Sequence, residues 1–426
     1  MSDYKSDLLR LLDERGYVHQ MTDAAGLDAL AARQVVPGYI GFDATAPSLH
    51  IGSLVQIMML RRLQQTGHKP IVVMGGGTTR IGDPTGRDES RKMLTDETIE
   101  ANIQSIFTVF DKLLKFGDGP TDAVMVNNHD WLGKLGYIEL LQQVGTHFTV
   151  NRMLTFDSVK LRLEREQPMT FLEFNYMILQ GYDFRHLSKT MGVRLQMGGS
   201  DQWGNITAGI DLIRKRLGRD SFGLTWPLVT KSDGTKFGKT ADGAVWLDAK
   251  RTSPYQFRQF WMQVSDIDIE RMLPQFSLRP MEEIASILNE QRLSPEKRVA
   301  QRTLANEITS MLHGKESANA AEQAADVLFG ANPVFASEAT LKLIAQEVAV
   351  TQMGTAVLHD AVGVLVTTGL ATSNSEARRL LQQRSVRANG EQLDEHAKLD
   401  KVALLHGRWM LLRKGKTAYH LLDFAG

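Results

Sequence analysis

The stretch Gly38–Ser53, GYIGFDATAPSLHIGS, decides the fold of this chain. Its first residues, Gly38–Phe42, are apolar and β-prone, and they predict a buried strand. Polar residues then end the strand and supply candidate caps: Asp43, Thr45, Pro47 and Ser48. From His50 onward, apolar residues at helical spacing predict a helix. The free backbone N–H groups at its start would face the turn. A phosphate chain could bind there, beside Thr45 and His50. The alternative is an ordinary strand-to-helix connection capped by Ser48.

A second strand and a glycine-rich loop follow this unit. Pro70–Met74 predicts a buried strand, and it leads into GGGTTRIGDPTGR at Gly75–Arg87, which carries Asp83 in its centre. Strand, helix and strand at this spacing predict a parallel βαβ unit, in which ligands bind at the carboxyl ends of the strands. Long glycine-rich loops in that position are more often binding loops than spacers.

Polar residues follow two further predicted strands. Ala123–Val126 leads into a polar run that includes Asn128, and Val193–Met197 leads into GGSDQWGN, which includes Asp201 and Gln202. The second of these repeats the strand-to-helix geometry of the first unit. Two such halves could face each other, although a plain surface turn after Val126 remains an equal alternative.

The helix predicted over Pro168–Leu187 carries a polar stripe. Tyr176, Gln180 and Asp183 fall at i, i+4 and i+7 among strongly apolar neighbours. Such stripes are usually solvated faces. Here the apolar surroundings favour a stripe that lines a cleft, and buried polar groups require a ligand or a fixed network.

Composition bounds the class of protein. The chain has 426 residues, of which 42% are hydrophobic and 23% are charged. Its 49 basic and 49 acidic residues balance, so the overall charge does not indicate binding to nucleic acid. This length predicts roughly three domains. The chain has no cysteine, so disulfides and thiolate zinc sites are excluded and a reducing cytoplasm is expected. No segment reads as a signal peptide or a membrane span, and no protein metal site is predicted.

The pattern changes twice along the chain. An α/β domain is expected over residues 1–252. Near its end, a strand is predicted over Phe222–Val229, and a mobile cationic loop, TKSDGTKFGKTADG, follows it. Helical periodicity then predicts an all-α domain over residues 253–350, and a linker is expected near Val350–Gly354. Residues 355–426 predict a small α+β module. It is expected to hold one helix over Ala356–Val366, a capping box at Ser373–Glu376 and a hairpin turn at Asn389–Gly390. Its basic residues favour an RNA or DNA backbone and include Arg378, Arg379, Arg413 and Lys414.

These motifs together resemble a known family. Class I aminoacyl-tRNA synthetases carry two signatures, HIGH and KMSKS. HIGS at His50–Ser53 resembles the first, and KFGKT at Lys236–Thr240 resembles the second. Further stretches look like the bacterial tyrosyl-tRNA synthetases: GFDATAPSLHIG, IGDPTG, YMILQGYDF, GGSDQWGN and LVTKSDGTKFGKT. The tail looks like a small RNA-binding fold shared with a ribosomal small-subunit protein. The resemblance covers nearly the whole chain.

The resemblance implies a Rossmann-like parallel-sheet catalytic domain, an α-helical domain on the anticodon side and a small RNA-binding domain. It implies a ligase that activates L-tyrosine with Mg²⁺-bound ATP to tyrosyl-adenylate and pyrophosphate. The tyrosyl group then moves to the 3′ end of tRNA(Tyr). Relatives imply a homodimer. The tyrosine carboxylate attacks the α-phosphorus itself, so catalysis consists mainly of positioning and charge stabilisation.

The resemblance also implies a role for each candidate residue. The outer phosphates would be held by Thr45, His50, Lys236, Lys239 and Thr240. Tyrosine would be bound by Tyr39 and Asp183 at its hydroxyl, by Asp83, Tyr176 and Gln180 at its ammonium group, and by Asn128 at the border of the pocket. The ATP or adenylate would lie against Asp43, Gly52, Asp201 and Gln202. The tRNA would meet Arg378, Arg379, Arg413 and Lys414.

The chain departs from the family pattern at three places. Ser53 replaces the final histidine of HIGH, so an imidazole contact to the ribose is not carried over. Arg87 stands where lysine is common, and it keeps the charge with a different reach. Arg384-Ser385 stands where a glycine pair is frequent, so a different turn is expected there.

Two rival functions remain open at this point. The tryptophan enzyme shares the fold, but the pair Tyr39 and Asp183 favours a phenol over an indole. A synthetase-derived non-catalytic RNA-binding protein would be expected to have a damaged phosphate site. The chain instead retains Thr45, His50, Lys236 and Lys239.

Overall fold

The computed structural model describes residues 3–83, 94–230, 232, 237–240 and 243–424. The chain divides into two compact units, one of residues 1–248 with 265–295, the other of residues 249–264 with 296–426. Each unit has its own sheet and its own core. The division assigns residues 265–295 of the predicted all-α domain to the first unit, and the three-domain boundaries of the sequence analysis stay a prediction.

The first unit is built on a six-stranded sheet in the order β1-β6-β5-β2-β3-β4. All neighbours are parallel except the edge pair of β1 with β6. The strands are β1 (Gln20–Met21), β2 (Pro37–Phe42), β3 (Lys69–Met74), β4 (Val124–Asn127), β5 (Leu195–Gly199) and β6 (Phe222–Trp226). The predicted parallel-sheet Rossmann-like core is therefore confirmed, and the strand order reverses between β2 and β5, where such folds bind ligands.

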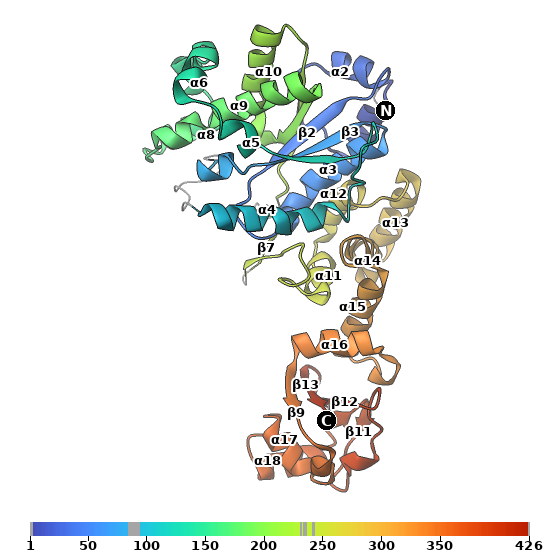
Figure 1. Cartoon of the computed structure of the whole chain (residues 1–426). Helices are drawn as coiled ribbons and strands as arrows, with labels where there is room; N and C mark the ends of the chain where they lie inside the picture. Colours follow the sequence, from blue (N-terminus) through green and yellow to red (C-terminus); the bar gives the residue numbers. More distant parts are fainter. Residues whose placement is uncertain (1–2, 84–93, 231, 233–236, 241–242, 425–426) are drawn as a thin grey trace. The chain divides into compact units, whose positions relative to one another are not determined.

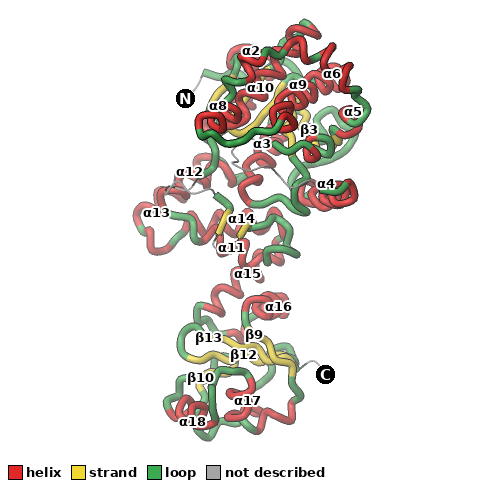
Figure 2. The backbone as a smooth tube through the Cα atoms, turned by 90° about the vertical axis from the view of Figure 1, so that its left-hand side faces the viewer, coloured by secondary structure: helices red, strands yellow, loops and turns green. Residues whose placement is uncertain are grey.

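Helices cover both faces of this sheet (Figures 1 and 2). Tyr39 packs edge-on against Phe184 of α9, whereas Phe42, three residues further along β2, packs against Phe110 of α4. The helices of the unit are α1 (Asp7–Glu14), α2 (Ala24–Ala31), α3 (Leu54–Gln65), α4 (Asp96–Phe110), α5 (His129–Leu132), α6 (Tyr137–Gln143), α7 (Val150–Met153), α8 (Asp157–Glu164), α9 (Phe171–Met191), α10 (Trp203–Leu217), α12 (Asp266–Phe276) and α13 (Met281–Leu293). A two-stranded ribbon joins β7 (Lys239–Thr240) to β8 (Gly243–Ala244).

Local sequence explains where these elements begin and end. The long helix α9 opens with a complete capping box between Thr170 and Glu173 and closes at Gly192 in the left-handed conformation. The strand predicted over Phe222–Val229 ends earlier, at Trp226, because Pro227 cannot donate a ladder hydrogen bond. The predicted cap Ser48 is not used, since its hydroxyl donates to the Leu49 carbonyl.

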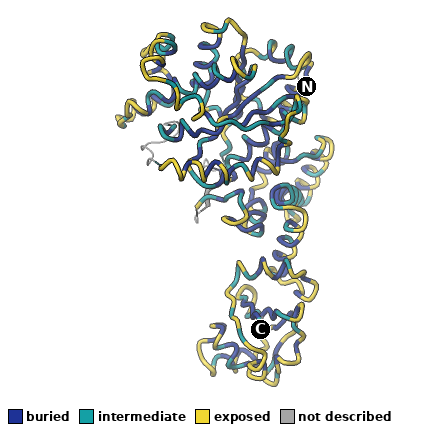
Figure 3. Tube along the Cα trace, in the orientation of Figure 1, coloured by how far each residue is buried: buried dark blue, intermediate teal, exposed yellow. Residues whose placement is uncertain are grey.

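The second unit combines helices with a five-stranded sheet in the order β11-β10-β12-β13-β9. Its elements are α11 (Pro254–Met262), α14 (Val299–His313), α15 (Lys315–Leu328), α16 (Glu338–Glu347), β9 (Ala349–Gln352), α17 (Ala361–Thr367), α18 (Asn374–Gln382), β10 (Val386–Ala388), β11 (Glu391–Gln392), β12 (Trp409–Lys414) and β13 (Ala418–Asp423). One core joins α15 and α16 to β12 and β13, and a second lies between the sheet and helices α17 and α18. Most of β12 and β13 is buried, and the buried stretches of the unit are dark blue in Figure 3.

Three expectations for this unit are corrected. The predicted linker Val350–Gly354 is wrong, because residues 349–352 form β9 and pair in parallel with β13. The single helix predicted over Ala356–Val366 is split, since Asp360 caps a new helix through the Gly363 N–H. At Ser373 the capping box is only half formed, because the Glu376 carboxylate accepts from the Thr372 N–H instead of from Ser373. The hairpin turn at Asn389–Gly390 is confirmed.

Candidate functional site

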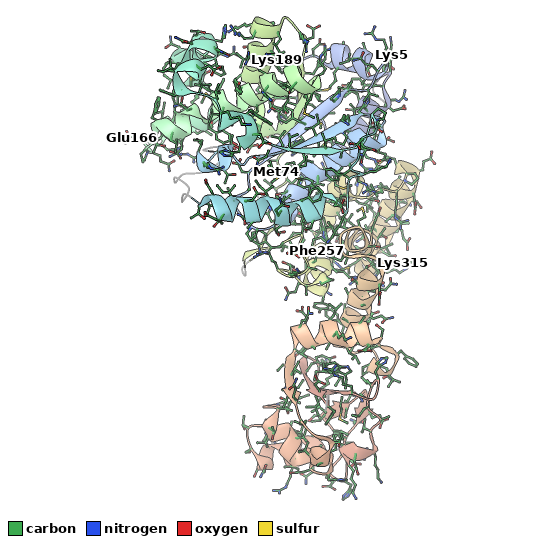
Figure 4. The ribbon with its side chains drawn as sticks, in the orientation of Figure 1. Lys5, Met74, Glu166, Lys189, Phe257 and Lys315 are labelled. Atoms are coloured by element: carbon green, nitrogen blue, oxygen red, sulfur yellow. The ribbon has the colours of Figure 1, made fainter. Side chains whose placement is uncertain are left out.

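Polar side chains meet at the carboxyl ends of β2, β3, β4 and β5. Met74, marked in Figure 4, ends β3, and its carbonyl accepts a 2.9 Å hydrogen bond from the Asn128 N–H. The glycine-rich loop after β3 and the polar run after β4 are thereby joined. This is the edge at which the sequence predicted a binding site.

One hydrogen-bonded chain crosses this edge from β2 to α9. Thr78 donates to Asp43 at 2.9 Å, and the Asn128 amide donates to Thr78 at 3.1 Å and to Asp183 at 2.9 Å. The Trp131 indole donates to the other Asp183 oxygen at 2.7 Å. Residues from four separate elements thus hold two carboxylates in place.

A second chain involves the polar stripe of α9 and the turn after β5. The Gln202 amide donates to Asp83 at 3.2 Å, and Gln180 donates to Gln202 at 3.3 Å. Asn205 donates to Gln180 at 2.9 Å. The Tyr176 hydroxyl reaches Asp43 at 3.4 Å and links the two chains.

The stripe predicted on α9 is therefore an inward-facing feature. Tyr176 is 7% and Asp183 is 4% exposed, and Gln180 is half-buried. Their hydrogen bonds are made to other loops and helices, so the prediction that the stripe faces inward is confirmed and the solvated-face alternative is wrong. Asp201 lies beside them in the turn Ser200–Gln202, where it is exposed.

The charge state of Asp183 is set mainly by its burial. Removal from water raises its pKa to about 7, although the hydrogen bonds from Asn128 and Trp131 act in the opposite direction. The Asp43 charge adds to the increase. Burial, together with the Asp183 charge, also raises the pKa of Tyr39 well above its usual value. Both groups are thus poised as neutral or weakly charged hydrogen-bonding partners.

Tyr39 has an unused polar atom. Its hydroxyl is buried and has no hydrogen-bond partner among the described residues. An unpaired buried hydroxyl costs roughly 1–3 kcal/mol, so a ligand that supplies a partner would recover this energy. The hydroxyl and the Asp183 carboxylate together match a ligand group that can both donate and accept.

The two signature motifs are adjacent in the structure. A side-chain carbon added at Gly238 would lie 2.9 Å from the Gly52 nitrogen and 2.7 Å from a methyl group of Ile51. Gly238 also has a φ of +94°, which favours glycine. The backbones of HIGS and KFGKT therefore approach each other more closely than side chains would permit.

Candidate phosphate ligands lie around this contact. Thr45 and His50 are exposed, and the His50 ring nitrogen accepts from the Gly52 N–H at 3.0 Å, so His50 caps the helical turn that Ser48 was expected to cap. Ser53 makes no side-chain cap. Lys239 and Thr240 form β7. Lys236 and Arg87 lie outside the described residues.

The candidate tRNA residues of the tail differ in how they are used. Arg378 and Arg379 are exposed on α18. Arg413 is half-buried, with its guanidinium over the Tyr419 ring at 5.4 Å. Lys414 donates to the Leu370 carbonyl at 2.7 Å and pairs with Glu376 at 3.3 Å. Arg378 and Arg379 are therefore the most accessible of the four.

Besides Trp131, in the polar run after β4, sequence reasoning missed Thr78 and Asn205 as members of the site. Thr78 lies in the glycine-rich loop, and Asn205 ends the GGSDQWGN motif. Position within these motifs was the available signal, but neither residue belongs to a periodic pattern. Within the described ranges, no three histidine or acidic side chains gather as metal ligands, and no helix could span a membrane.

Comparison with known proteins gives a consistent result. Residues 33–330 match the family described as tRNA synthetases class I (W and Y), and residues 341–422 match the C-terminal domain of SYY-like tyrosine–tRNA ligases. A tyrosine–tRNA ligase of Novosphingobium aromaticivorans is 52% identical over 423 residues, 99% of each chain. One of Zymomonas mobilis is 52% identical over 404 residues, 95% of this chain and 96% of the other.

A solved structure is also similar. The C-terminally truncated mitochondrial tyrosyl-tRNA synthetase of Coccidioides posadasii superposes with a TM-score of 0.65 and 34% identity. The match covers 74% of this chain and 91% of that one.

Proposed function

The chain belongs to the class I aminoacyl-tRNA synthetases of the tryptophan and tyrosine group, and from this premise we propose that it is a tyrosine–tRNA ligase. It activates L-tyrosine with ATP to give tyrosyl-adenylate and pyrophosphate, and then transfers the tyrosyl group to the 3′ end of tRNA(Tyr). ATP enters as its Mg²⁺ complex, a substrate. The high identity to named ligases does not favour the non-catalytic alternative.

The buried pair of Tyr39 and Asp183 is the observation that carries this proposal. A phenol hydroxyl can donate to the Asp183 carboxylate and accept from the Tyr39 hydroxyl, which lacks a partner among the described residues. Phenylalanine would leave the Tyr39 hydroxyl unpaired and would give Asp183 no donor, and an indole can only donate. Tyrosine enzymes are the known example of selection by a site built for a hydroxyl.

The second hydrogen-bonded chain suits the other end of the amino acid. We assign the ammonium group of tyrosine to Asp83, Tyr176 and Gln180. Hydrogen bonds through Gln202 join Asp83 to Gln180, and the Tyr176 hydroxyl is bonded to Asp43. Asn128 borders the pocket and fixes Asp183. We assign Asp43, Gly52, Asp201 and Gln202 to ATP and the adenylate.

The activation step needs no nucleophile from the protein. The tyrosine carboxylate attacks the α-phosphorus, and negative charge grows on the departing pyrophosphate. Thr45 and His50 on one motif, with Lys236, Lys239 and Thr240 on the other, would hold that pyrophosphate. The close contact of Gly52 with Gly238 supports this arrangement because it brings the two motifs together. Contacts that strengthen as charge develops lower the barrier instead of merely binding ATP.

We also propose a cytoplasmic homodimer that binds tRNA through its tail. Large apolar side chains are exposed along α6, α7, α8 and the start of α9, which is unusual for a monomer (Figure 3): Tyr137, Ile138, Val150, Leu161, Leu163 and Phe171. We expect Ile138→Asp combined with Phe171→Asp to give a monomer by light scattering. Leu293→Asp, at an equally exposed apolar residue elsewhere, is the control and should remain a dimer.

Pyrophosphate exchange tests the catalytic proposal. Exchange measured with each amino acid in turn should be robust with tyrosine and weak with phenylalanine and tryptophan. Asp183→Ala should lower kcat/KM for tyrosine by about 10- to 100-fold, since a charged hydrogen bond is lost. Asp118→Ala, at an exposed position of the same unit, is the control. An active preparation with no tyrosine-dependent exchange would refute the proposal.

A further inference from the structure

The helix α5 is attached to α9 through the two sides of one indole. The Trp131 N–H donates to Asp183 at 2.7 Å. The ring face of Trp131 stacks on the imidazole of His186, with ring centroids 4.6 Å apart and an angle of 14° between the planes. Asp183 and His186 are three residues apart on α9, so they lie one turn apart on the same side of the helix.

These two contacts fix different properties of the indole. The hydrogen bond to Asp183 sets the distance, but an indole held only there could still pivot about the N–H···O axis. The stack on His186 adds to the packing of Trp131 against the buried cluster that includes Phe184 and Leu187. It helps to hold the plane of the ring, and therefore the direction in which its N–H points. Tyr182, one turn earlier, supports the imidazole with its ring centroid at 6.2 Å.

The state of the imidazole suits this role. Burial, with the charges of Arg185 and Lys189 nearby, holds the pKa of His186 below its usual value, which favours the neutral form of the ring. A neutral, half-buried ring that stacks in parallel acts as a flat support for the indole. None of the described hydrogen bonds of the site uses the His186 side chain, which leaves stacking as its contribution.

We propose that His186 is a positioning residue for tyrosine selection, which acts by holding Trp131 in the plane that directs its N–H at Asp183. His186 reaches the Asp183 carboxylate through the indole, and it does not contact the tyrosine. Without the His186 ring, the Trp131 indole would pivot. Its N–H would then no longer be aligned with the Asp183 oxygen that accepts from Trp131, while the other oxygen would still accept from Asn128. The inference rests on the proposed function, because it concerns the hydroxyl end of the same pocket.

The experiment compares three variants of the full chain with the wild type. His186→Ala removes the ring, and His186→Phe keeps a flat aromatic ring without nitrogen atoms. Lys189→Ala is the matched control, since Lys189 is exposed on the next turn of α9 (Figure 4). Pyrophosphate exchange gives kcat and KM for tyrosine, for phenylalanine and for ATP, and thermal unfolding gives Tm.

A stacking role predicts a specific pattern. His186→Ala should raise the KM for tyrosine roughly three- to tenfold and lower the preference for tyrosine over phenylalanine by a similar factor, with the KM for ATP unchanged. His186→Phe should restore both values, and Lys189→Ala should match the wild type. If the Ala variant is too unstable to assay, His186→Gln, which fills part of the space without a ring, should show the same change.

Three results would overturn the inference. His186→Ala could leave tyrosine selection unchanged, the Phe variant could be as impaired as the Ala variant, or the loss could fall equally on tyrosine and ATP with a lowered Tm. The last result is the mark of a general packing role. A wild-type enzyme without tyrosine-dependent exchange would instead refute the proposed function, so the two failures are distinguishable.

Discussion

The side-chain amide of Asn128 donates to the Asp183 carboxylate at 2.9 Å across 55 positions of sequence. The same side chain donates to Thr78 at 3.1 Å and accepts from the Gly77 N–H at 2.7 Å. Both donors and the acceptor of the amide are therefore used. Asn128 ties the glycine-rich loop to the carboxylate assigned to the tyrosine hydroxyl, so its removal should affect selection before it affects ATP use.

Asn128→Ala should weaken tyrosine binding. Asp183 would keep only the Trp131 donor, and the loss of one hydrogen bond to a charged group corresponds to roughly a tenfold or greater rise in the KM for tyrosine. The KM for ATP should stay within about twofold. Steady-state pyrophosphate exchange measures both. Asn175→Ala is the control, because the Asn175 amide donates only to Phe171 within α9; an effect of equal size there would contradict the assignment.

Asp183→Asn should alter the pH dependence of stability. Burial raises the pKa of Asp183 to about 7, above its ordinary value of 3.8, so the folded protein binds this proton more tightly than the unfolded chain. The resulting stabilisation is fully present below about pH 4 and is lost as the pH rises through about 7. The Tm of the wild type should therefore fall relative to that of Asp183→Asn between pH 5 and pH 8. A constant difference across that range would contradict the raised pKa.

Arg378→Glu combined with Arg379→Glu should weaken tRNA charging and spare activation. Both side chains are exposed on α18, where reversed charges would repel phosphates. We expect a higher KM for tRNA, a weaker dependence of binding on salt, and unchanged tyrosine-dependent exchange. The double lysine variant keeps the charge and should behave nearly as the wild type. Normal charging by the double glutamate variant would remove these two residues from the tRNA surface.

Arg384→Gly should stabilise the second unit. Arg384 has a φ of 50°, and it follows α18 where the Ser385 N–H bonds to the Leu380 carbonyl and the Arg384 N–H to that of Leu381. This is the usual glycine-centred helix end, formed here by arginine at a cost of about 1 kcal/mol. Urea unfolding should show a rise of roughly 0.5–1 kcal/mol in the free energy of unfolding. The rise is smaller than the full cost of the arginine, because glycine gives the unfolded chain extra freedom.

The control for this prediction is Arg384→Ala. It removes the charge but keeps the unfavourable φ, so it should give no gain in the free energy of unfolding. A gain of equal size in both variants would assign the effect to charge, since Arg384 lies 3.9 Å from Asp394 in an exposed pair.

The sequence determined the local elements of this protein and most of the candidate residues. Apolar spacing, glycine and proline positions, and caps such as Thr170 act over a few residues, and they set the strands and helices of the parallel sheet. The polar stripe on α9 was visible for the same reason. Proline at 227 and the cap at Asp360, both local, account for the boundaries that the sequence analysis misplaced.

Tertiary structure alone decided which residues meet. Thr78 and Asn205 have no periodic pattern, and they joined the site because β3 and β5 end at one edge of the sheet. Residues 349–352 became a strand only because β13 offered an edge to pair with. The unpaired hydroxyl of Tyr39 beside Asp183 likewise arises from packing between distant segments. Local sequence fixes backbone geometry, whereas burial and hydrogen-bond partners depend on contacts that only the folded chain brings together.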